Sequence, residues 1–491
     1  ALIHGLPEST GDCARDIAIC PPDWKYGVSV GEVPEAPVTK LEHPHALGRE
    51  RRHASSLVRM KLASINMVCI YVVLFVFLAC TNPALGYSVL THEAIVDAAW
   101  DVSIRPLLLQ RFPNATPEEL KTAHAYAYGG AIIQDLGYYP HGSHFFSDLT
   151  HYCRTGDFVL ALLRDSQDLN GYAFAIGALS HYAADIAGHR IGINPSVPIL
   201  YPKLESKYGK FVTYEEDPLA HIKAEFGFDV LEVARQRYAP DSYHDFIGFQ
   251  VDLPLLEEAF HETYGLELKS VLSDENKVIG SYRRDVSKLI PKATKIAWSL
   301  KKDDIQRDQP SMTKRKFLYN LSRASYDKNW GRDYQRPTAF ERFLAFLYKL
   351  LPKFGPLRVL QLRTPTPQTE HMFEASFNAA LDHYKALLGE TRTSTPEVPD
   401  VNLDTGGTTA PGVYFMSDNV RAKLLEKLAE QDFAGVTPGI RANLLHFYSD
   451  PNAPYATKRN AKQWNKLQID LKKLKEFAAP ASAGQDLHPL D

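Results

Sequence analysis

Residues 171–189 of this 491-residue chain read GYAFAIGALSHYAADIAGH, which is typical of a buried helix. His181 and Asp185 lie four residues apart, so in a helix their side chains lie one above the other on the same face. His189 follows on that face another four residues along. Most of the other residues are Ala or Gly, whose small side chains allow close contact with neighbouring helices. We therefore predict a deeply buried helix with three candidate metal ligands along one stripe.

The rest of the chain shows the same helical character. It lacks a sustained alternation of apolar and polar residues and a series of Asn-Gly or Asp-Gly turns, which are the usual signals of strands and hairpins. Helical spacing of apolar residues recurs instead. The further helices predicted in this way cover residues 91–100, 118–129, 157–164, 219–237, 253–266, 417–431 and 461–477. The sequence therefore predicts an all-α protein.

The composition is that of an ordinary globular chain. Hydrophobic residues make up 45% and charged residues 23%, which excludes wholesale disorder and a collagen-like fibre. Lys and Arg number 55 against 58 Asp and Glu, so a net charge of −3 gives no electrostatic reason to expect specific nucleic-acid binding. Only Cys153 lies beyond residue 80, so disulfides do not hold the main body together.

Residues 60–86 have the pattern of a secretory signal peptide. A basic start at Met60-Lys61 is followed by an apolar run at 68–79 and then by small residues. The run holds about a dozen residues, fewer than the roughly 20 that a membrane span needs. We expect cleavage after Gly86, which makes Tyr87 the mature amino terminus of a secreted or periplasmic protein.

Other interpretations of this region stay open. Phe77-Leu78-Ala79-Cys80 is an imperfect lipobox, so lipoprotein anchoring at Cys80 is one alternative. A long disordered cytoplasmic arm before a membrane anchor is the other. Residues 1–59 show no apolar periodicity, and we interpret them as an upstream extension that is disordered or not native.

Composition divides the remaining chain into four parts. Residues 87–300 form the domain that carries the metal-ligand motifs, and residues 301–390 form a helical extension with a highly charged start. Residues 391–412 are dense in Thr, Pro, Asp and Gly, which is typical of a loop or linker. Residues 413–491 form a C-terminal helical region.

A second His–carboxylate pair repeats the spacing of the first. His221 and Glu225 again lie four residues apart. One such pair is common as a weak ion pair on a solvated helix face, but two pairs with His189 in register favour a metal site. Nitrogen and oxygen ligands without thiolates suit a catalytic zinc with an open coordination position.

Further candidate ligands lie beside one turn-rich loop. Asp135 and His144 flank the sequence LGYYPHGS, and two ligand types on one loop could complete a site built on rigid helices. His141 and His151 are the substitutes, although His151 could equally be a capping or surface histidine.

Taken in order, these motifs resemble the zinc-dependent phospholipase C family from Tyr87 to about residue 232. The pattern is most similar to the catalytic domain of glycosylphosphatidylinositol-specific phospholipase D. It is similar, more distantly, to the single-strand-specific zinc nucleases of the same superfamily. The features that carry the resemblance are Tyr87-Ser-Val-Leu-Thr-His92, Asp135, His144-Phe145, His181-x-Ala-Ala-Asp185-x-x-x-His189 and His221-x-x-x-Glu225.

The resemblance implies a multi-helix domain of the phospholipase C/P1 nuclease type around three zinc ions. One zinc would be held by Asp135, His144, His181 and Asp185, and a second by His189, His221 and Glu225. Asp185 would bridge to a third zinc, completed by His92 and the terminal amine and carbonyl of Tyr87. Asp135 would also be the catalytic residue that orients the attacking water or acts as its general base.

These features predict a secreted zinc-dependent phosphodiesterase that hydrolyses phospholipids through a metal-activated water attacking phosphorus. Cleavage of the phospholipase D type, cleavage of glycosylphosphatidylinositol, and nuclease activity are the alternatives with the same metals. An alternative of another class is a non-catalytic zinc-binding envelope protein.

Two sets of apolar residues have roles that the sequence leaves open. Tyr138, Tyr139, Phe145 and Phe146 lie beside proposed ligands, where they could line a substrate pocket or belong to the core. The C-terminal helix carries Trp464, Leu467, Leu471 and Leu474 among lysines. That face could make peripheral contact with an anionic membrane or pack on its own domain.

Overall fold

The computed structural model describes residues 89–139, 141–234, 249–284, 303, 306–307 and 363–477. Among these residues the regular structure is helical, and an isolated bridge between Val401 and Thr408 is the only strand-like pairing. The prediction of an all-α fold is confirmed. The predicted extension at 1–59, the signal peptide at 60–86 with Cys80, Tyr87, and most of the charged start of the 301–390 segment lie outside the described residues.

Most of residues 171–189 belong to α7 (Leu169–Ala187), which is buried along nearly its whole length. The Asp168 side chain caps the first turn by accepting a hydrogen bond from the Gly171 amide. The chain continues without a break into the π-helical turn η3 (Gly188–Ile193). One continuous helical segment thus carries the three predicted ligands of this stretch, His181, Asp185 and His189.

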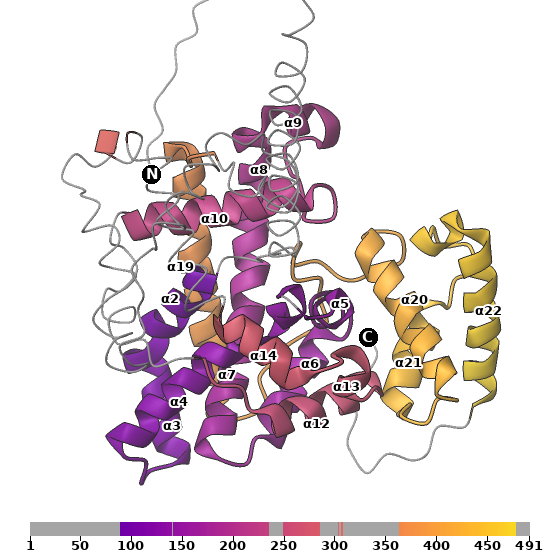
Figure 1. The fold of residues 1–491 in the computed structure, drawn as a ribbon, viewed down its shortest axis with the longest axis horizontal. Coiled ribbons are helices and arrows are strands. Elements are labelled where there is room, and N and C mark those ends of the chain that lie inside the picture. The colour runs from indigo at the N-terminus through magenta and orange to yellow at the C-terminus, as the bar shows by residue number, and fades with distance from the viewer. Residues whose placement is uncertain are drawn as a thin grey trace, which may run out of the picture. The chain divides into compact units, whose positions relative to one another are not determined.

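Helix α4 (Pro117–Gly130) packs against α7 with the two backbones in close contact (Figure 1). A Cβ atom at Gly177 would lie 2.1 Å from the carbonyl oxygen of Ala127, and one at Gly130 would lie 1.9 Å from that of Phe174. Neither position has room for any side chain, so the small residues predicted to allow close packing do so here.

The other helices are shorter than α7 or lie later in the chain. Before α7 they are α2 (Val89–Ala99), η1 (Trp100–Ile104), α3 (Arg105–Arg111), η2 (Ile133–Tyr138), α5 (His144–Tyr152) and α6 (Thr155–Asp165). After it come α8 (Asn194–Leu200), α9 (Pro202–Tyr208), α10 (Pro218–Ala234), α12 (Leu253–Tyr264), α13 (Leu268–Val271) and α14 (Glu275–Arg284). Each predicted helix in these regions has a counterpart, with its ends shifted by a few residues.

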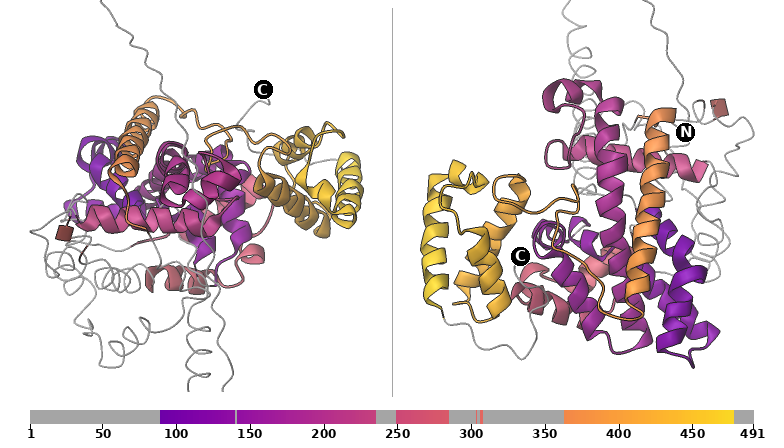
Figure 2. Two further views of the ribbon diagram at one scale, coloured as in Figure 1. Left: turned by 90° about the horizontal axis from the view of Figure 1, so that it is seen from above. Right: turned by 180° about the vertical axis from the view of Figure 1, so that it is seen from behind.

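Helix α19 (Pro367–Glu390) returns from far along the sequence to pack against α7 and η3 (Figure 2). The Tyr384 hydroxyl donates a hydrogen bond of 2.9 Å to the carbonyl oxygen of Ile176 in α7. The rings of Phe373 and Phe228 stack with centroids 4.7 Å apart, which joins α19 to α10. The later part of the chain therefore shares the hydrophobic core of the first part.

The C-terminal region contains α20 (Phe415–Glu430), α21 (Pro438–Phe447), η6 (Ala456–Arg459) and α22 (Ala461–Glu476). Leu467, Leu471 and Leu474 of α22 are buried, and α22 packs against α20. Packing within the protein thus occupies this apolar face, while most lysines of α22 are exposed. Within the described residues, no helix has both the length and the apolar character needed to cross a bilayer.

Residues 398–409, here called the 398–409 loop, connect α19 to the C-terminal helices. The loop is non-helical, as predicted, but it is held firmly against the first part of the chain. The Tyr182 hydroxyl donates to the Pro399 carbonyl at 2.7 Å, and the Thr155 hydroxyl donates to the Val401 carbonyl at 2.8 Å. The Asp400 carboxylate accepts hydrogen bonds from two amides at the start of α6. Val398, Leu403 and Asp404 are buried.

Candidate metal centre

The structure gathers buried imidazoles and carboxylates into three groups that could each hold a metal ion. The first group is His92, His181 and Asp185; the second is Asp135, His151 and His181; the third is His189, His221 and Asp404. His181 belongs to the first two groups, so these sites adjoin. Every member is at most 6% exposed, so no member has bulk water to solvate it.

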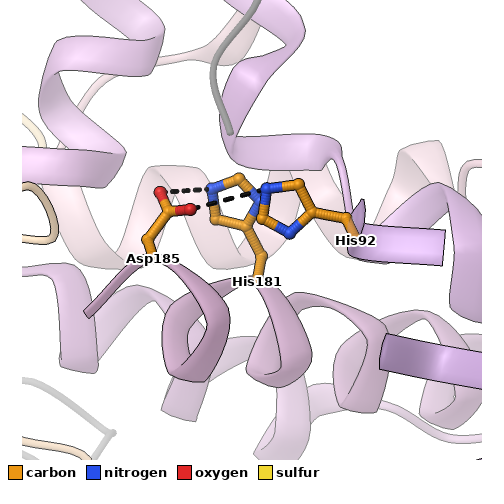
Figure 3. Close-up of side chains that lie close together, drawn as sticks. All are labelled: His92, His181 and Asp185. Atoms are coloured by element: carbon orange, nitrogen blue, oxygen red, sulfur yellow. Dashed lines mark ion pairs between the residues drawn. The ribbon is translucent and has the colours of Figure 1, made fainter. Parts of the chain in front are cut away.

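Asp185 lies at the junction of the first two groups. Its Oδ1 is 3.4 Å from His92 Nε2 and its Oδ2 is 3.1 Å from His181 Nε2 (Figure 3). The rings of His92 and His181 stack, with centroids 4.3 Å apart. Asp185 also lies 3.4 Å from His151 Nε2 and 3.5 Å from His189 Nε2. One carboxylate therefore faces four imidazoles, as a bridging ligand would.

In the second group, the orientation of two imidazoles is set by backbone carbonyls. His181 Nδ1 lies 2.9 Å from the Ala131 oxygen, and His151 Nδ1 lies 2.7 Å from the Ser147 oxygen. A carbonyl can only accept, so each Nδ1 carries a proton and each neutral ring has its lone pair at Nε2. The two Nε2 atoms face each other at 3.3 Å. Two facing lone pairs repel unless a proton or a metal ion lies between them.

The third group combines residues from three parts of the chain. His189 Nδ1 lies 3.6 Å from Glu225 Oε1 and 3.7 Å from Asp404 Oδ1. His221 Nδ1 lies 2.9 Å from the same Glu225 oxygen, and its Nε2 lies 2.7 Å from Asn194 Oδ1. Since the Asn194 oxygen can only accept, His221 donates from Nε2 and keeps Nδ1 for a proton or a metal.

Several separations in the centre fit zinc better than direct hydrogen bonds, while those of Asp185 from His181 at 3.1 Å and of Glu225 from His221 at 2.9 Å are of hydrogen-bond length. Four ligand atoms at about 2.0–2.1 Å from a tetrahedral zinc lie about 3.3–3.4 Å apart. The separations of Asp185 from His92, His151 and His189 are 3.4–3.5 Å, longer than the usual 2.7–3.2 Å of a hydrogen bond. Among the described residues, the Oδ1 atoms of Asp135 and Asp185 accept no hydrogen bond. The donor set therefore fits zinc.

The electrostatics of the centre point the same way. Burial would lower the pKa of His151, but the carboxylates of Asp135 and Asp185 raise it to about 10. Burial opposes a charge on His221 as well, and Glu225 and Asp404 raise its pKa to about 10. By contrast, burial and the neighbouring His181 lower the pKa of His92 to about 3. The buried carboxylates thus stabilise positive charge inside the centre, and either protons or metal ions can supply that charge.

One predicted ligand does not reach these groups. His144 is exposed at the first turn of α5, and His151, seven residues later on the same helix, takes part in the second group instead. Seven residues are nearly two full turns, so both side chains share one face, about 10 Å apart along the axis. Helical spacing alone cannot distinguish them; only the packing of α5 decides which turn lies beside α7.

The other predicted ligands are distributed as follows. His92, Asp135, His181, Asp185, His189 and His221 each belong to one of the groups, and Glu225 lies against His189 and His221. The substitute His141 is exposed, and Tyr87 lies outside the described residues. Asp404 is the member that sequence reasoning missed. It lies in a segment rich in Thr, Pro, Asp and Gly, and no helical spacing or pairing distinguishes it from neighbouring acids.

Of the four aromatic residues in and beside the loop at 136–143, three lie in the hydrophobic core and one faces the candidate centre. Tyr139, Phe145 and Phe146 belong to the main hydrophobic core. Tyr138 instead faces the candidate centre, with its ring centroid 5.9 Å from that of His151 and 6.1 Å from that of Tyr214. Cys153 is buried and free, in agreement with a structural role.

Comparison with known proteins gave one match. Residues 91–274 match the family model described as zinc dependent phospholipase C. No curated protein and no solved structure matched the chain. Apart from Asp404, all members of the three groups, and Glu225, fall within the matched residues.

Proposed function

We propose that this protein is a hydrolase of phosphodiester bonds in phospholipids, because residues 91–274 match the family model of zinc-dependent phospholipase C. The match supports activity of the phospholipase C type, and the buried histidines and acids supply a fitting site for the zinc that the family requires. The observation that carries the proposal is the pair of facing Nε2 atoms of His151 and His181, each ring fixed by a carbonyl behind it.

We propose a division of roles among the residues of the centre. Bound zinc supplies Lewis acidity to the phosphate oxygens and lowers the pKa of a nearby water. The carbonyls of Ala131 and Ser147 hold the imidazoles of His181 and His151 in the orientation that zinc needs. Asp135, with an oxygen that accepts no hydrogen bond from the described residues, is the group we assign to orient the attacking water or take up its proton.

Export of the protein is a further part of this proposal. The pattern of residues 60–86 supports secretion or release into the periplasm after cleavage behind Gly86. The Leu90 amide and the Thr91 hydroxyl donate hydrogen bonds to Asp229 of α10, which anchors the first turn of α2. Tyr87 precedes α2 by two residues, so we propose that its freed amine completes the group around His92.

Analysis of reaction products tests the proposed activity. The processed, zinc-loaded protein should release diacylglycerol from phosphatidylcholine, and removal of zinc by a chelator should abolish the reaction. Release of phosphatidic acid would favour the phospholipase D-type alternative. Absence of bound zinc, together with no hydrolysis of any phosphodiester in a panel of lipids, glycosylphosphatidylinositol and single-stranded nucleic acid, would leave the non-catalytic interpretation.

A further inference from the structure

We propose that Asp404 is a metal ligand of the third group, so that a loop outside the matched family segment completes the metal centre. This inference rests on the proposed function in one respect, the binding of zinc at the centre. It assigns a role to a part of the chain, the 398–409 loop, that lies beyond residues 91–274.

Hydrogen bonds fix the Asp404 carboxylate with Oδ1 facing the histidines, and Oδ1 itself accepts one of them from Asn194. Oδ2 accepts hydrogen bonds from the Tyr414 hydroxyl at 2.7 Å and from the Tyr214 amide at 3.0 Å. Oδ1 lies 3.7 Å from His189 Nδ1 and 3.5 Å from His221 Nε2. The separation from His189 Nδ1 exceeds hydrogen-bond length and approaches the ligand spacing of a tetrahedral zinc. His221 Nε2 donates to Asn194, so His221 would coordinate through Nδ1.

His189 Nδ1 faces two carboxylates at nearly equal distances. Glu225 Oε1 lies 3.6 Å from it and Asp404 Oδ1 lies 3.7 Å from it. Two buried carboxylates around one nitrogen concentrate negative charge that a single shared proton neutralises only in part. A dication between them would be neutralised by the two acids and coordinated by two imidazoles, which is a donor set that zinc accepts.

The fold holds Asp404 in place independently of any metal. Asn194 Nδ2 donates hydrogen bonds to the Asp404 carbonyl at 2.7 Å and to Asp404 Oδ1 at 3.2 Å, while Asn194 Oδ1 accepts from His221. The Leu403 amide donates to the carbonyl of His151 at 3.0 Å. The loop thus contacts residues of both the second and the third groups, and its acid is positioned before metal binds.

The test compares two Asp→Asn changes on the same loop in the full processed protein. Asp404→Asn removes the charge at the centre. Asp400→Asn is the matched control, because Asp400 accepts from the Gly156 and Asp157 amides and an Asn oxygen can still accept. We expect Asp404→Asn to lose one zinc per chain, or at least about tenfold in zinc affinity in chelator competition, while Asp400→Asn keeps the wild-type values.

A second readout addresses the coordination itself. The visible spectrum of the cobalt(II)-substituted protein should change in Asp404→Asn and stay unchanged in Asp400→Asn. Asp404→Glu, which keeps a carboxylate, should recover part of the lost affinity. Thermal unfolding of the metal-free variants checks that each folds.

The outcomes separate this inference from the proposed function. Wild-type zinc content, affinity and cobalt spectrum in Asp404→Asn would overturn the inference and leave the enzyme assignment intact. Equal losses of zinc affinity in both Asn variants would also overturn it, because they would show that the loop supports the centre structurally without Asp404 binding the metal. A wild-type protein that binds no zinc would instead remove the premise of the proposed function.

Discussion

At the scale of single residues, chemistry at this centre depends on which groups hold metal and which act on water. The candidate ligands are buried and surrounded by each other, so replacing one leaves its neighbours with uncompensated charge. Asp135 differs, because an uncharged Asn of the same shape can still coordinate weakly but cannot take up a proton.

Asp135→Asn should therefore separate catalysis from metal binding. We expect turnover of phosphatidylcholine to fall by about 10²–10⁴-fold, the range typical of lost general acid–base catalysis, with zinc content largely kept. Steady-state kinetics and metal analysis on the same preparation provide the measurement. Parallel loss of zinc and activity would make Asp135 a structural ligand only.

The two histidines of α5 offer a sharper comparison. His151→Gln should lose zinc, because its Nε2 lies 3.3–3.4 Å from His181, Asp135 and Asp185. His144→Gln, at the exposed first turn of the same helix, should keep full zinc content. Metal counting on both variants decides the matter, and the reverse ranking would restore His144 as the ligand.

At the scale of elements, the close packing of α4 and α7 positions the centre. His181 follows Gly177 by one turn, so displacement of α7 at that point would move a histidine shared by two groups. The contact depends on the absence of a side chain, because a Cβ at Gly177 would meet the Ala127 carbonyl oxygen at 2.1 Å.

Gly177→Ala should consequently destabilise the fold. Overpacking of this kind costs about 1–3 kcal/mol or more, since the obstructing atom belongs to the backbone and cannot rotate away. Gly280→Ala in α14 is the control: no atom lies within 4 Å of the added Cβ, and a helical Ala should gain up to about 1 kcal/mol. Chemical denaturation of both variants measures the difference, which would be absent if α4 and α7 could separate freely.

At the scale of the whole molecule, folding and metal binding should be coupled. The candidate ligands come from α2, η2, α5, α7, η3, α10 and the 398–409 loop, so bound metal ions would join segments that are distant in sequence. Unfolding would disperse these ligands and release the metal.

Zinc removal should accordingly lower the unfolding temperature by several degrees or more. When the free zinc concentration is one hundred times the dissociation constant of a site, binding at that site stabilises the folded state by about 2.7 kcal/mol. Differential scanning calorimetry with zinc and with a chelator measures the shift. Coincident unfolding curves under both conditions would contradict a metal that links these segments.

The proposed cleavage before Tyr87 should also affect metal binding by the whole protein. A variant that keeps extra residues before Tyr87 has an amide where the processed chain has an amine, and an amide nitrogen is a poor zinc ligand. We expect such a variant to bind one zinc fewer than the processed form, as measured by metal analysis. Equal zinc content would show that the terminal amine is dispensable.

The sequence by itself indicated the all-α class, helices such as α7 and α10, and the two His–carboxylate pairs, because these depend on the local 3.6-residue period. It also carried the resemblance to zinc-dependent phospholipase C, and the model of that family matches residues 91–274. Tertiary structure alone decided that His151 reaches the centre where His144 does not, and that Asp404 arrives beside His189 and His221. Packing between distant segments sets which turn of α5 faces α7. It also sets where the 398–409 loop, more than 170 residues after Glu225, lies against the earlier helices. Local periodicity in the sequence carries no information about such packing.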